Sequence, residues 1–255
     1  MPALHYTHPK SLEGTAKNDI VAPTPDLSDT IQALRWSPVS NHLAVAAWDG
    51  RTRIYEVSMT DGQTRGVTVI NAEGPLLSCD WSKDGSLVAT AGADGKIYVL
   101  QASSGQAVSF TAHNSPIRDV RFVDDVPGCS APIIALGSQP KPITWQCHRN
   151  PRSTTSNPVI TDIYSVNAVA VHPTVKGCVA TAGSDGSYRF WNAELSTHNR
   201  SYSDVGSPIT ACAFDCTGLW FAYAVGYDWA KGCYHNEASI PTRLVLHRVS
   251  KDDAK

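Results

Sequence analysis

Apolar and polar positions alternate along this chain in short runs, and each run ends in small or turn-forming residues. One sequence motif recurs at residues 43–55, 87–99 and 178–191, and an altered copy occurs at residues 220–229. In each regular copy an alternating run leads into Asp-Gly, and a second alternating run follows. A period of two predicts β-strands, and Asp-Gly between two such runs favours a tight hairpin because both residues tolerate positive φ. The pattern therefore predicts an all-β chain built from repeated hairpins.

The spacing of the repeated aspartates gives the length of the repeating unit. Asp49, Asp94, Asp185 and Asp228 are separated by steps of 45, 91 and 43 residues. The middle step therefore spans two periods, with a blurred copy in between. A period of roughly 40–45 residues is typical of the WD40 blade, which has four strands. We interpret Asp49, Asp94 and Asp185 as structural residues of the blade turns.

Five repeats are recognisable, and they predict one WD40 β-propeller over residues 30–249. A four-stranded blade cannot bury both faces alone, so blades stack around a ring. Residues 1–29 are expected to form a flexible N-terminal extension and residues 250–255 a polar tail. The repeats lie near residues 31–57, 77–101, 113–146, 166–192 and 208–248. The aromatic residues expected to pack between blades are Trp36, Trp81, Phe122, Trp191 and Phe214.

The composition indicates a well-packed protein without a strongly basic surface. Hydrophobic residues make up 42% and charged residues 17%, the formal net charge is −2, and the sequence pI is about 6.5. A protein that grips phosphates over its whole surface is expected to be basic, so nucleic-acid contact would have to come from a local patch. No apolar run is long enough for a signal peptide or a membrane helix, so we expect an intracellular protein without membrane contact.

The sequence offers no candidate for catalysis or metal binding. The seven cysteines form no Cys-x-x-Cys pair, and we expect most of them to be small buried side chains. Gly-x-Ser-x-Gly, His-Glu-x-x-His and a phosphate-binding glycine loop are missing. We therefore expect a protein that binds other macromolecules and not an enzyme, with no cofactor, no metal and no small-molecule substrate.

Three stretches carry a resemblance to a known family. Residues 47–57, with Trp48-Asp49-Gly50, resemble the first blade of the nuclear-pore-associated mRNA export factors (Rae/Gle type). Cys147-His148-Arg149, residues 162–167 and His172-Pro173 resemble the long loop and the following blade of that family. Residues 221–232 resemble its closing repeat, so the resemblance covers about residues 30–229.

This resemblance implies a non-enzymatic adaptor at the nuclear pore that promotes export of poly(A) mRNA. The implied partners are a nucleoporin peptide motif and mRNA or mRNP, with contacts to the ubiquitin machinery. The implied location is the nucleus with the nuclear pore and envelope, and also the cytoplasm. The related mitotic-checkpoint propeller shares Trp48-Asp49-Gly50 but differs from the ending at residues 227–232. A spindle-checkpoint adaptor that binds kinase-derived peptide motifs is therefore the alternative.

The number of blades departs from the family pattern. The resemblance implies seven blades, whereas the sequence supports five repeats. The irregularity falls near Ala135-Leu136, and Gln139-Pro140 stands where Asp-Gly is expected. We expect roughly two blades to be missing, which leaves the ring gapped or distorted. In the family the nucleoporin motif meets basic residues on mid-ring blades, and that is the part affected here.

Two turns carry aromatic and basic side chains that suit a partner-binding face. Aromatic residues beside Arg or Lys dominate protein interfaces, and they also stack on single-stranded bases. If the first and last repeats are neighbours in the ring, these side chains form one patch. The alternative is that Trp48 and Trp229 pack between blades. The candidates are Trp48, Arg51 and Arg53 in the first repeat and Tyr227, Asp228, Trp229 and Lys231 in the last.

Two further expectations concern the middle of the chain. Residues 147–161 are rich in Ser, Thr, Pro and Asn and read as a loop between blades, in which Arg149 and Arg152 are candidates for RNA contact. A solvated loop is the alternative. His113 stands where WD repeats carry a histidine that bonds the turn Asp of the same blade, but its expected partner position holds Gln139. This predicts a broken polar network in that repeat.

Overall fold

The computed structural model describes residues 13–122, 147–151, 160–203, 205–237 and 239–255. The helical segments in these residues are two short 3-10 helices, η2 (Ala16–Asn18) and η3 (Cys233–His235), and none is long and apolar enough to cross a membrane. The remaining regular structure consists of strands: β1 (Glu13–Thr15), β2 (Ile20–Val21), β3 (Ile31–Trp36), β4 (His42–Ala47), β5 (Arg51–Val57), β6 (Thr64–Asn71), β7 (Leu76–Trp81), β8 (Leu87–Gly92), β9 (Lys96–Gln101), β10 (Ala107–Thr111), β11 (Arg149–Pro151), β12 (Thr161–Ile163), β13 (Val166–Val171), β14 (Cys178–Gly183), β15 (Tyr188–Asn192), β16 (Thr197–Ser203), β17 (Ile209–Phe214), β18 (Trp220–Val225) and β19 (Arg243–Arg248).

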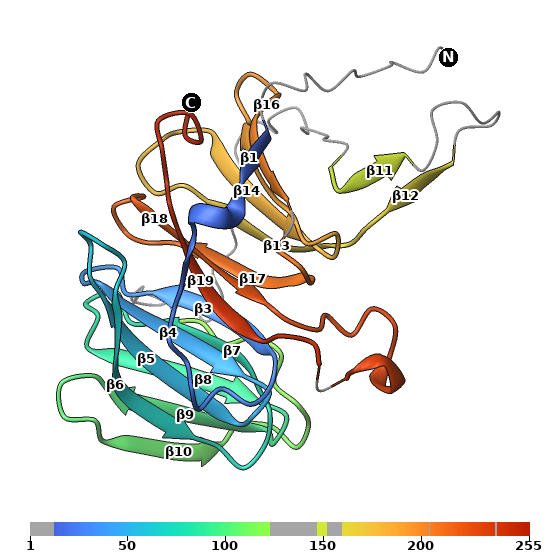
Figure 1. Ribbon diagram of the computed structural model, residues 1–255. Coiled ribbons are helices and arrows are strands. Elements are labelled where there is room, and N and C mark those ends of the chain that lie inside the picture. The colour runs from blue at the N-terminus through green and yellow to red at the C-terminus, as the bar shows by residue number, and fades with distance from the viewer. Residues whose placement is uncertain (1–12, 123–146, 152–159, 204, 238) are drawn as a thin grey trace, which may run out of the picture.

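Four of the five predicted repeats form blades, which we number after the repeats (Figure 1). Blade I is β3–β6 and blade II is β7–β10, and in each of them every strand pairs antiparallel with the next. Blade IV is β13–β16, with β1 added in parallel to its outer strand β16. Blade V is β17–β19, and its outer strand is β2 from the N-terminal side of the chain. The prediction of an all-β propeller is confirmed.

The Asp-Gly signals mark the turns between the second and third strands of the blades. Gly50, Gly95 and Gly186 have φ values of 76°, 73° and 65°. Glycine takes this left-handed conformation without the strain that a Cβ atom causes. At Gly95 a Cβ would also lie 2.2 Å from the carbonyl oxygen of His113. The repeated glycine is therefore a requirement of the backbone.

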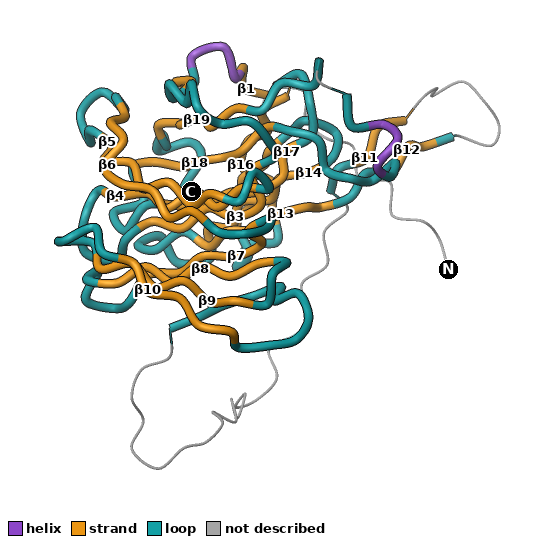
Figure 2. The backbone as a smooth tube through the Cα atoms, turned by 90° about the horizontal axis from the view of Figure 1, so that it is seen from below, coloured by secondary structure: helices purple, strands orange, loops and turns teal. Residues whose placement is uncertain are grey.

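The blades stack side by side in an arc, in the order II, I, V, IV (Figures 1 and 2). Their first strands β7, β3, β17 and β13 are neighbours in that order. One hydrophobic cluster fills each interface. Trp81 lies in the cluster between blades I and II, Trp36 and Trp220 in that between I and V, and Phe190 and Phe221 in that between IV and V. Burial between blades is therefore what holds the arc together.

The other three aromatic residues expected between blades differ in their surroundings. Phe214 packs against the cluster between blades IV and V. Trp191 is buried on β15 and donates a hydrogen bond to Thr181. Phe122 is half-buried, and its amide donates to the carboxylate of Asp80 on β7.

Within the described residues the four sheets do not close into a ring, and blades II and IV form the two ends of the arc (Figure 1). Repeat 113–146 lies between them in the sequence, but only its residues 113–122 are described. Gln139 and the irregularity near Ala135 lie outside the described residues. Both ends of the arc carry exposed apolar side chains, namely Val108 and Phe110 on β10 and Val166, Val169 and Val171 on β13. The gapped ring that the repeat count predicted is consistent with this arrangement.

The ends of the described chain differ from the expected extension and tail. Ile20–Val21 completes blade V, and Glu13–Thr15 lengthens blade IV. In the tail, Asp253 is fully buried against blade IV and accepts a hydrogen bond from Tyr202. The structure therefore includes residues 13–29 and 250–255 in the propeller, because tertiary pairing orders segments that have no periodicity of their own.

The segment after the third repeat also differs from a plain loop. Arg149–Pro151 pairs antiparallel with Thr161–Ile163, and this two-stranded ladder lies beside blade IV (Figure 1). The expected loop is therefore partly a β-ladder.

Candidate partner-binding face

Trp48 and Trp229 stack against each other at the loops of two neighbouring blades. Trp48 follows β4 in blade I, and Trp229 lies in the long connection between β18 and β19 in blade V. Their ring centroids are 4.7 Å apart, and the ring planes are inclined by 31°. The Trp48 indole donates a hydrogen bond of 2.9 Å to Oε1 of Gln32. The sequence predicts that these residues meet if the first and last repeats are neighbours, and blades I and V are neighbours here. Their role in binding a partner stays a prediction.

Trp229 is held in an unusual backbone conformation. Its φ is 61°, in the left-handed region that a bulky residue rarely adopts. Tyr227 stabilises the turn, because its hydroxyl donates a 2.7 Å hydrogen bond to the carbonyl oxygen of Gly232. The Tyr227 and Trp229 rings also meet edge to face at 5.4 Å. Residues with such strained backbones cluster at functional sites, so this loop is a candidate for binding a partner.

Asp228 fastens the same loop to the adjacent blade. Its Oδ2 accepts hydrogen bonds from Asn167 Nδ2 on β13, at 3.2 Å, and from the Ser184 hydroxyl in the turn of blade IV. Its Oδ1 accepts from the amide of Ala230 at 3.2 Å. Asp228 is therefore a positioning residue between blades IV and V, with both carboxylate oxygens already in use.

The three basic candidates divide into two exposed residues and one buried residue. Arg51 and Lys231 are exposed, and neither forms an ion pair with another residue in the part of the chain that the structure describes. Arg53 is only 3% exposed. Its Nε lies 2.8 Å from Oδ2 of Asp26, and its guanidinium lies 2.8 Å from Oδ2 of Asp49. We therefore assign Arg53 a structural role and define the Trp48–Trp229 surface as Trp48, Arg51, Trp229 and Lys231.

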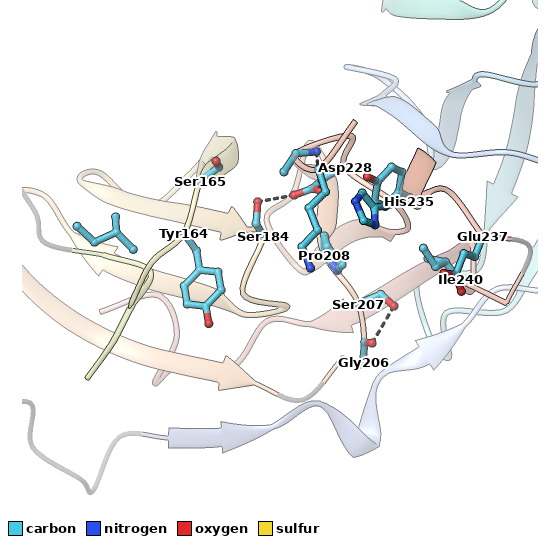
Figure 3. Close-up of a pocket in the computed structure, with 14 residues that line it drawn as sticks. Tyr164, Ser165, Ser184, Gly206, Ser207, Pro208, Asp228, His235, Glu237 and Ile240 are labelled. Atoms are coloured by element: carbon cyan, nitrogen blue, oxygen red, sulfur yellow. Dashed lines mark hydrogen bonds between the residues drawn. The ribbon is translucent and has the colours of Figure 1, made fainter. Parts of the chain in front are cut away.

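A cavity of about 520 Å³ adjoins this surface between blades IV and V (Figure 3). Its walls are formed by Tyr164 and Ser165 before β13, by Ser184 in the turn after β14, by residues 206–208 between β16 and β17, and by the loop after β18. Tyr227, Asp228 and Lys231 belong to its lining, so the cavity and the Trp48–Trp229 surface share a rim. Its remaining lining residues are Ile163, Gly206, Ser207, Pro208, Ala230, His235, Glu237 and Ile240. The lining combines apolar side chains with hydroxyl and charged groups, so the cavity can hold an amphipathic side chain of a bound partner.

The turn aspartates accept hydrogen bonds from their own surroundings. Asp49 binds Arg53, and Asp94 accepts from the amide of Lys96 at 3.0 Å and from the hydroxyl of Tyr98. Asp185 accepts from Ser187 and Arg189. Their geometry is that of turn stabilisers.

His148 is a structural residue that the sequence analysis missed. Its Nδ1 lies 2.7 Å from Oδ1 of Asp185, and its Nε2 lies 3.1 Å from the hydroxyl of Thr181. Trp191 donates to the same hydroxyl at 2.9 Å. Although burial opposes ionisation, hydrogen bonds from His148 and Ser187 and the nearby Arg189 lower the pKa of Asp185 to about 2. These buried hydrogen bonds fasten the turn of blade IV to the segment that precedes the blade. This is the histidine–aspartate contact typical of WD repeats, which the sequence predicts to be broken at His113.

The remaining candidates lie apart from the Trp48–Trp229 surface. Arg149 is exposed on β11, and Arg152 lies outside the described residues. His113 is exposed, and its amide donates to the carbonyl oxygen of Gly95. In the described part of the chain, no group of His, Cys, Asp and Glu side chains is arranged to hold a metal ion.

Comparison with known proteins identifies the repeats and their relatives. Residues 24–56 and 65–100 match the family described as WD domain, G-beta repeat. The chain is 29% identical to the Poly(A)+ RNA export protein of Schizosaccharomyces pombe, over 95% of this chain and 94% of that protein. It is 28% identical to the mRNA export factor GLE2 of Chaetomium thermophilum, over 95% of this chain and 93% of that one. Among solved structures, the WD40 β-propeller domain of Doa1 has the same fold, with a TM-score of 0.56, 13% identity, and coverage of 93% and 99%.

The lengths of these alignments bear on the missing blades. The alignment with the fission yeast protein is 340 positions long, 85 more than the 255 residues of this chain. At least that many positions of the relative have no counterpart here, which is the length of about two WD40 repeats. The expectation of a chain shorter by two blades is therefore supported. The chain carries WD40 repeats and folds into propeller blades, and over 95% of its length it is similar to proteins named as a poly(A)+ RNA export protein and an mRNA export factor.

Proposed function

We propose that this protein is a non-catalytic adaptor that promotes export of poly(A) mRNA from the nucleus. The names of the relatives support this role, and so does a fold that holds binding loops on a rigid scaffold. In this proposal the protein docks at the nuclear pore through a nucleoporin peptide motif that binds at the Trp48–Trp229 surface, and not on the mid-ring blades that the resemblance implies. It contacts mRNA or mRNP and the ubiquitin machinery, and it works in the nucleus, at the pore and in the cytoplasm.

The Trp48–Trp229 surface is the observation that carries the proposal. Trp and Arg are the residue types that most often dominate the binding energy of protein interfaces. Here Trp229 lies on a loop that Asp228 and Tyr227 hold in place, and it stacks on Trp48 of the neighbouring blade, so little conformational entropy is lost when a partner binds. Arg51 and Lys231 add positive charge that favours an acidic segment. The adjoining cavity offers space for one side chain of that segment (Figure 3).

A binding titration with labelled peptides tests the proposal. The full chain is titrated with the nucleoporin motif peptide and, separately, with a checkpoint-kinase motif peptide. The proposal predicts saturable binding to the first peptide and a loss of at least about tenfold in affinity for Trp229→Ala, because a central Trp contributes about 2 kcal/mol or more. Preferential binding of the kinase peptide would favour the checkpoint alternative.

Tyr234→Ala is the matched control for this titration. Tyr234 lies on the same loop and is 96% exposed, but it is outside the stacked pair. Its removal is expected to leave the affinity for the nucleoporin peptide within about twofold, since an isolated exposed side chain adds little binding energy. Equal losses in Trp229→Ala and Tyr234→Ala would place the binding energy elsewhere on the loop and would reject the stacked pair as the centre of the site.

A further inference from the structure

The His247 imidazole lies between two carboxylates in the interior of the protein. Its Nδ1 is 2.8 Å from Oδ1 of Asp19, and its Nε2 is 3.3 Å from Oδ2 of Asp253. His247 is 6% exposed, and Asp253 has no exposed surface. A carboxylate is only an acceptor, so both ring nitrogens must carry a hydrogen to satisfy both contacts. The geometry is therefore that of an imidazolium cation bound by two anions.

These three residues come from three separate segments of the chain. Asp19 lies between η2 and β2 on the N-terminal side, His247 lies on β19 of blade V, and Asp253 lies in the C-terminal tail. The tail is bound to blade IV as well, because Asn199 Nδ2 donates to the Asp253 carbonyl oxygen at 3.0 Å. Asp19 and Asp253 thus meet on one side chain although they stand at opposite ends of the described chain.

Tyrosine hydroxyls complete the surroundings of the three groups. Tyr188 on β15 and Tyr223 on β18 donate to Oδ2 of Asp19 at 2.7 and 2.8 Å, and Tyr202 on β16 donates to Oδ1 of Asp253 at 2.8 Å. Burial and the neighbouring carboxylates raise the pKa of all three phenols, so they stay neutral donors. The positive charge of Arg243 lowers the pKa of Tyr223 and that of Arg200 lowers the pKa of Tyr202, but burial and the carboxylates outweigh both. The Tyr188 hydroxyl also lies 3.0 Å from Nδ1 of His247. Among the described residues, His247 alone supplies a positive charge by direct hydrogen bonds to the two carboxylates.

We propose that His247, Asp19 and Asp253 form a proton-dependent clamp that fastens both ends of the described chain onto blades IV and V. With the imidazole protonated, β2 stays paired to β19 and the tail stays on blade IV. When the proton leaves, one of the two carboxylates loses its imidazole donor. The tyrosine hydroxyls and Ser250 still donate to the carboxylates, but the two buried negative charges then have no cation among their hydrogen-bond partners, which is unfavourable. The N-terminal strands and the tail then loosen together, before the blade interfaces open.

The direction of the pH effect follows from the charges. Burial lowers the pKa of His247, but the hydrogen bonds and negative charges of Asp19 and Asp253 outweigh it, so the pKa is raised overall. A histidine with a raised pKa in the folded state stabilises fully below its unfolded value, about 6.5, and this stability is lost as pH rises through the folded value. The clamp is therefore closed in mildly acidic solution and opens on the alkaline side.

Hydrogen exchange followed by NMR on the full chain tests the clamp. The reporters are the amides of Ala22, which bonds to Leu244, and of Asp253, which bonds to Ser250, and the reference is strand β8. Relative to β8, protection at both reporters is expected to fall together by up to about tenfold per pH unit above the folded pKa. In His247→Gln, protection is expected to be low at every pH, without this slope.

His172→Gln is the control, because His172 is also buried but faces no carboxylate at hydrogen-bond distance. Its Nε2 lies 3.1 Å from the Gly218 carbonyl oxygen, its Nδ1 accepts from the amide of Val175, and burial lowers its pKa. This variant is expected to keep the slope at the two reporters. A titration of the His247 ring signals gives a second test that needs no variant. A midpoint at or below 6.5, or an equal slope in wild type and His247→Gln, would overturn the proposal.

Discussion

His148 and Asp185 lie 2.7 Å apart although 37 residues separate them in the sequence. This contact joins the segment before blade IV to the turn inside the blade, and Thr181 and Trp191 extend it into the interior. His148 is fully buried, so its loss leaves polar groups without partners. The pair is therefore central to the stability of this end of the arc.

We expect His148→Asn to lower the free energy of unfolding by about 2–4 kcal/mol. Asparagine tolerates the positive φ of this position, which is 51°, so the substitution removes the ring while the backbone conformation stays accessible. Urea denaturation measures the change. His113→Asn is the control, because His113 is exposed, and it is expected to cost less than about 0.5 kcal/mol. Equal costs would show that the ring of His148 contributes no special stability.

The stacked indoles are expected to stabilise each other. A double-mutant cycle with Trp48→Ala, Trp229→Ala and the double variant should give a coupling energy of about 0.5–1.5 kcal/mol. Thermal and urea unfolding provide the four stabilities. Strictly additive effects would mean that the 4.7 Å contact between the rings does not contribute to folding.

Two glycines with positive φ are expected to respond differently to alanine. Gly95 has φ of 73°, and a Cβ would meet the His113 carbonyl oxygen at 2.2 Å, whereas Gly232 has φ of 81° and no atom within 4 Å of that position. Gly232→Ala should cost about 1–2 kcal/mol from the left-handed conformation alone. Gly95→Ala should cost about 1–3 kcal/mol more, because the backbone must also move. Similar stabilities for the two variants would contradict this account of the turn.

Acid is expected to destabilise the protein through Asp185 and Asp253. Burial opposes the ionisation of both, but hydrogen bonds from His148 and from His247, Ser250 and Tyr202 outweigh it, so the pKa of each is lowered to about 2. A carboxyl group with a lowered pKa stabilises the fold above its unfolded value, near 4, and this stability is lost as pH falls through the folded value. Each group should contribute up to about 2 kcal/mol.

Urea denaturation between pH 5 and pH 2 measures the free energy of unfolding and tests this predicted loss of stability in acid. Asp185→Asn should be less stable than wild type at pH 5, and the difference should shrink towards pH 2. A constant difference over this range would show that Asp185 does not titrate as described.

The local chemistry of the sequence predicted the blades well. The Asp-Gly pairs marked the hairpin turns because only a few residues accept the backbone conformation that those turns require. The same repeat order placed Trp48 and Trp229 on neighbouring blades, since the repeats at the two ends of a propeller chain meet in the ring. The turns follow from short-range rules and the contact between the two tryptophans from the order of the repeats, so both could be predicted from the sequence.

Features that depend on partners distant in the sequence could not be predicted from the sequence. Ile20–Val21 is too short to show a period, and its pairing with β19 is set by tertiary structure. The position of Arg53 could not be read from alternation, because β5 is covered on both faces by neighbouring blades. His148 looked like part of a loop because Asp185, its partner, follows in the next blade. Arg152 and the centre of the third repeat lie outside the described residues, so their expected roles remain predictions.

The export role is tested most directly by replacing the Poly(A)+ RNA export protein of Schizosaccharomyces pombe with this chain in living cells. Poly(A)+ RNA is then located by in situ hybridisation. The proposal predicts that the wild-type chain restores cytoplasmic poly(A)+ RNA, that Tyr234→Ala does so equally, and that Trp48→Ala/Trp229→Ala does not. Nuclear retention of poly(A)+ RNA in cells that contain the folded wild-type chain would contradict the proposed function.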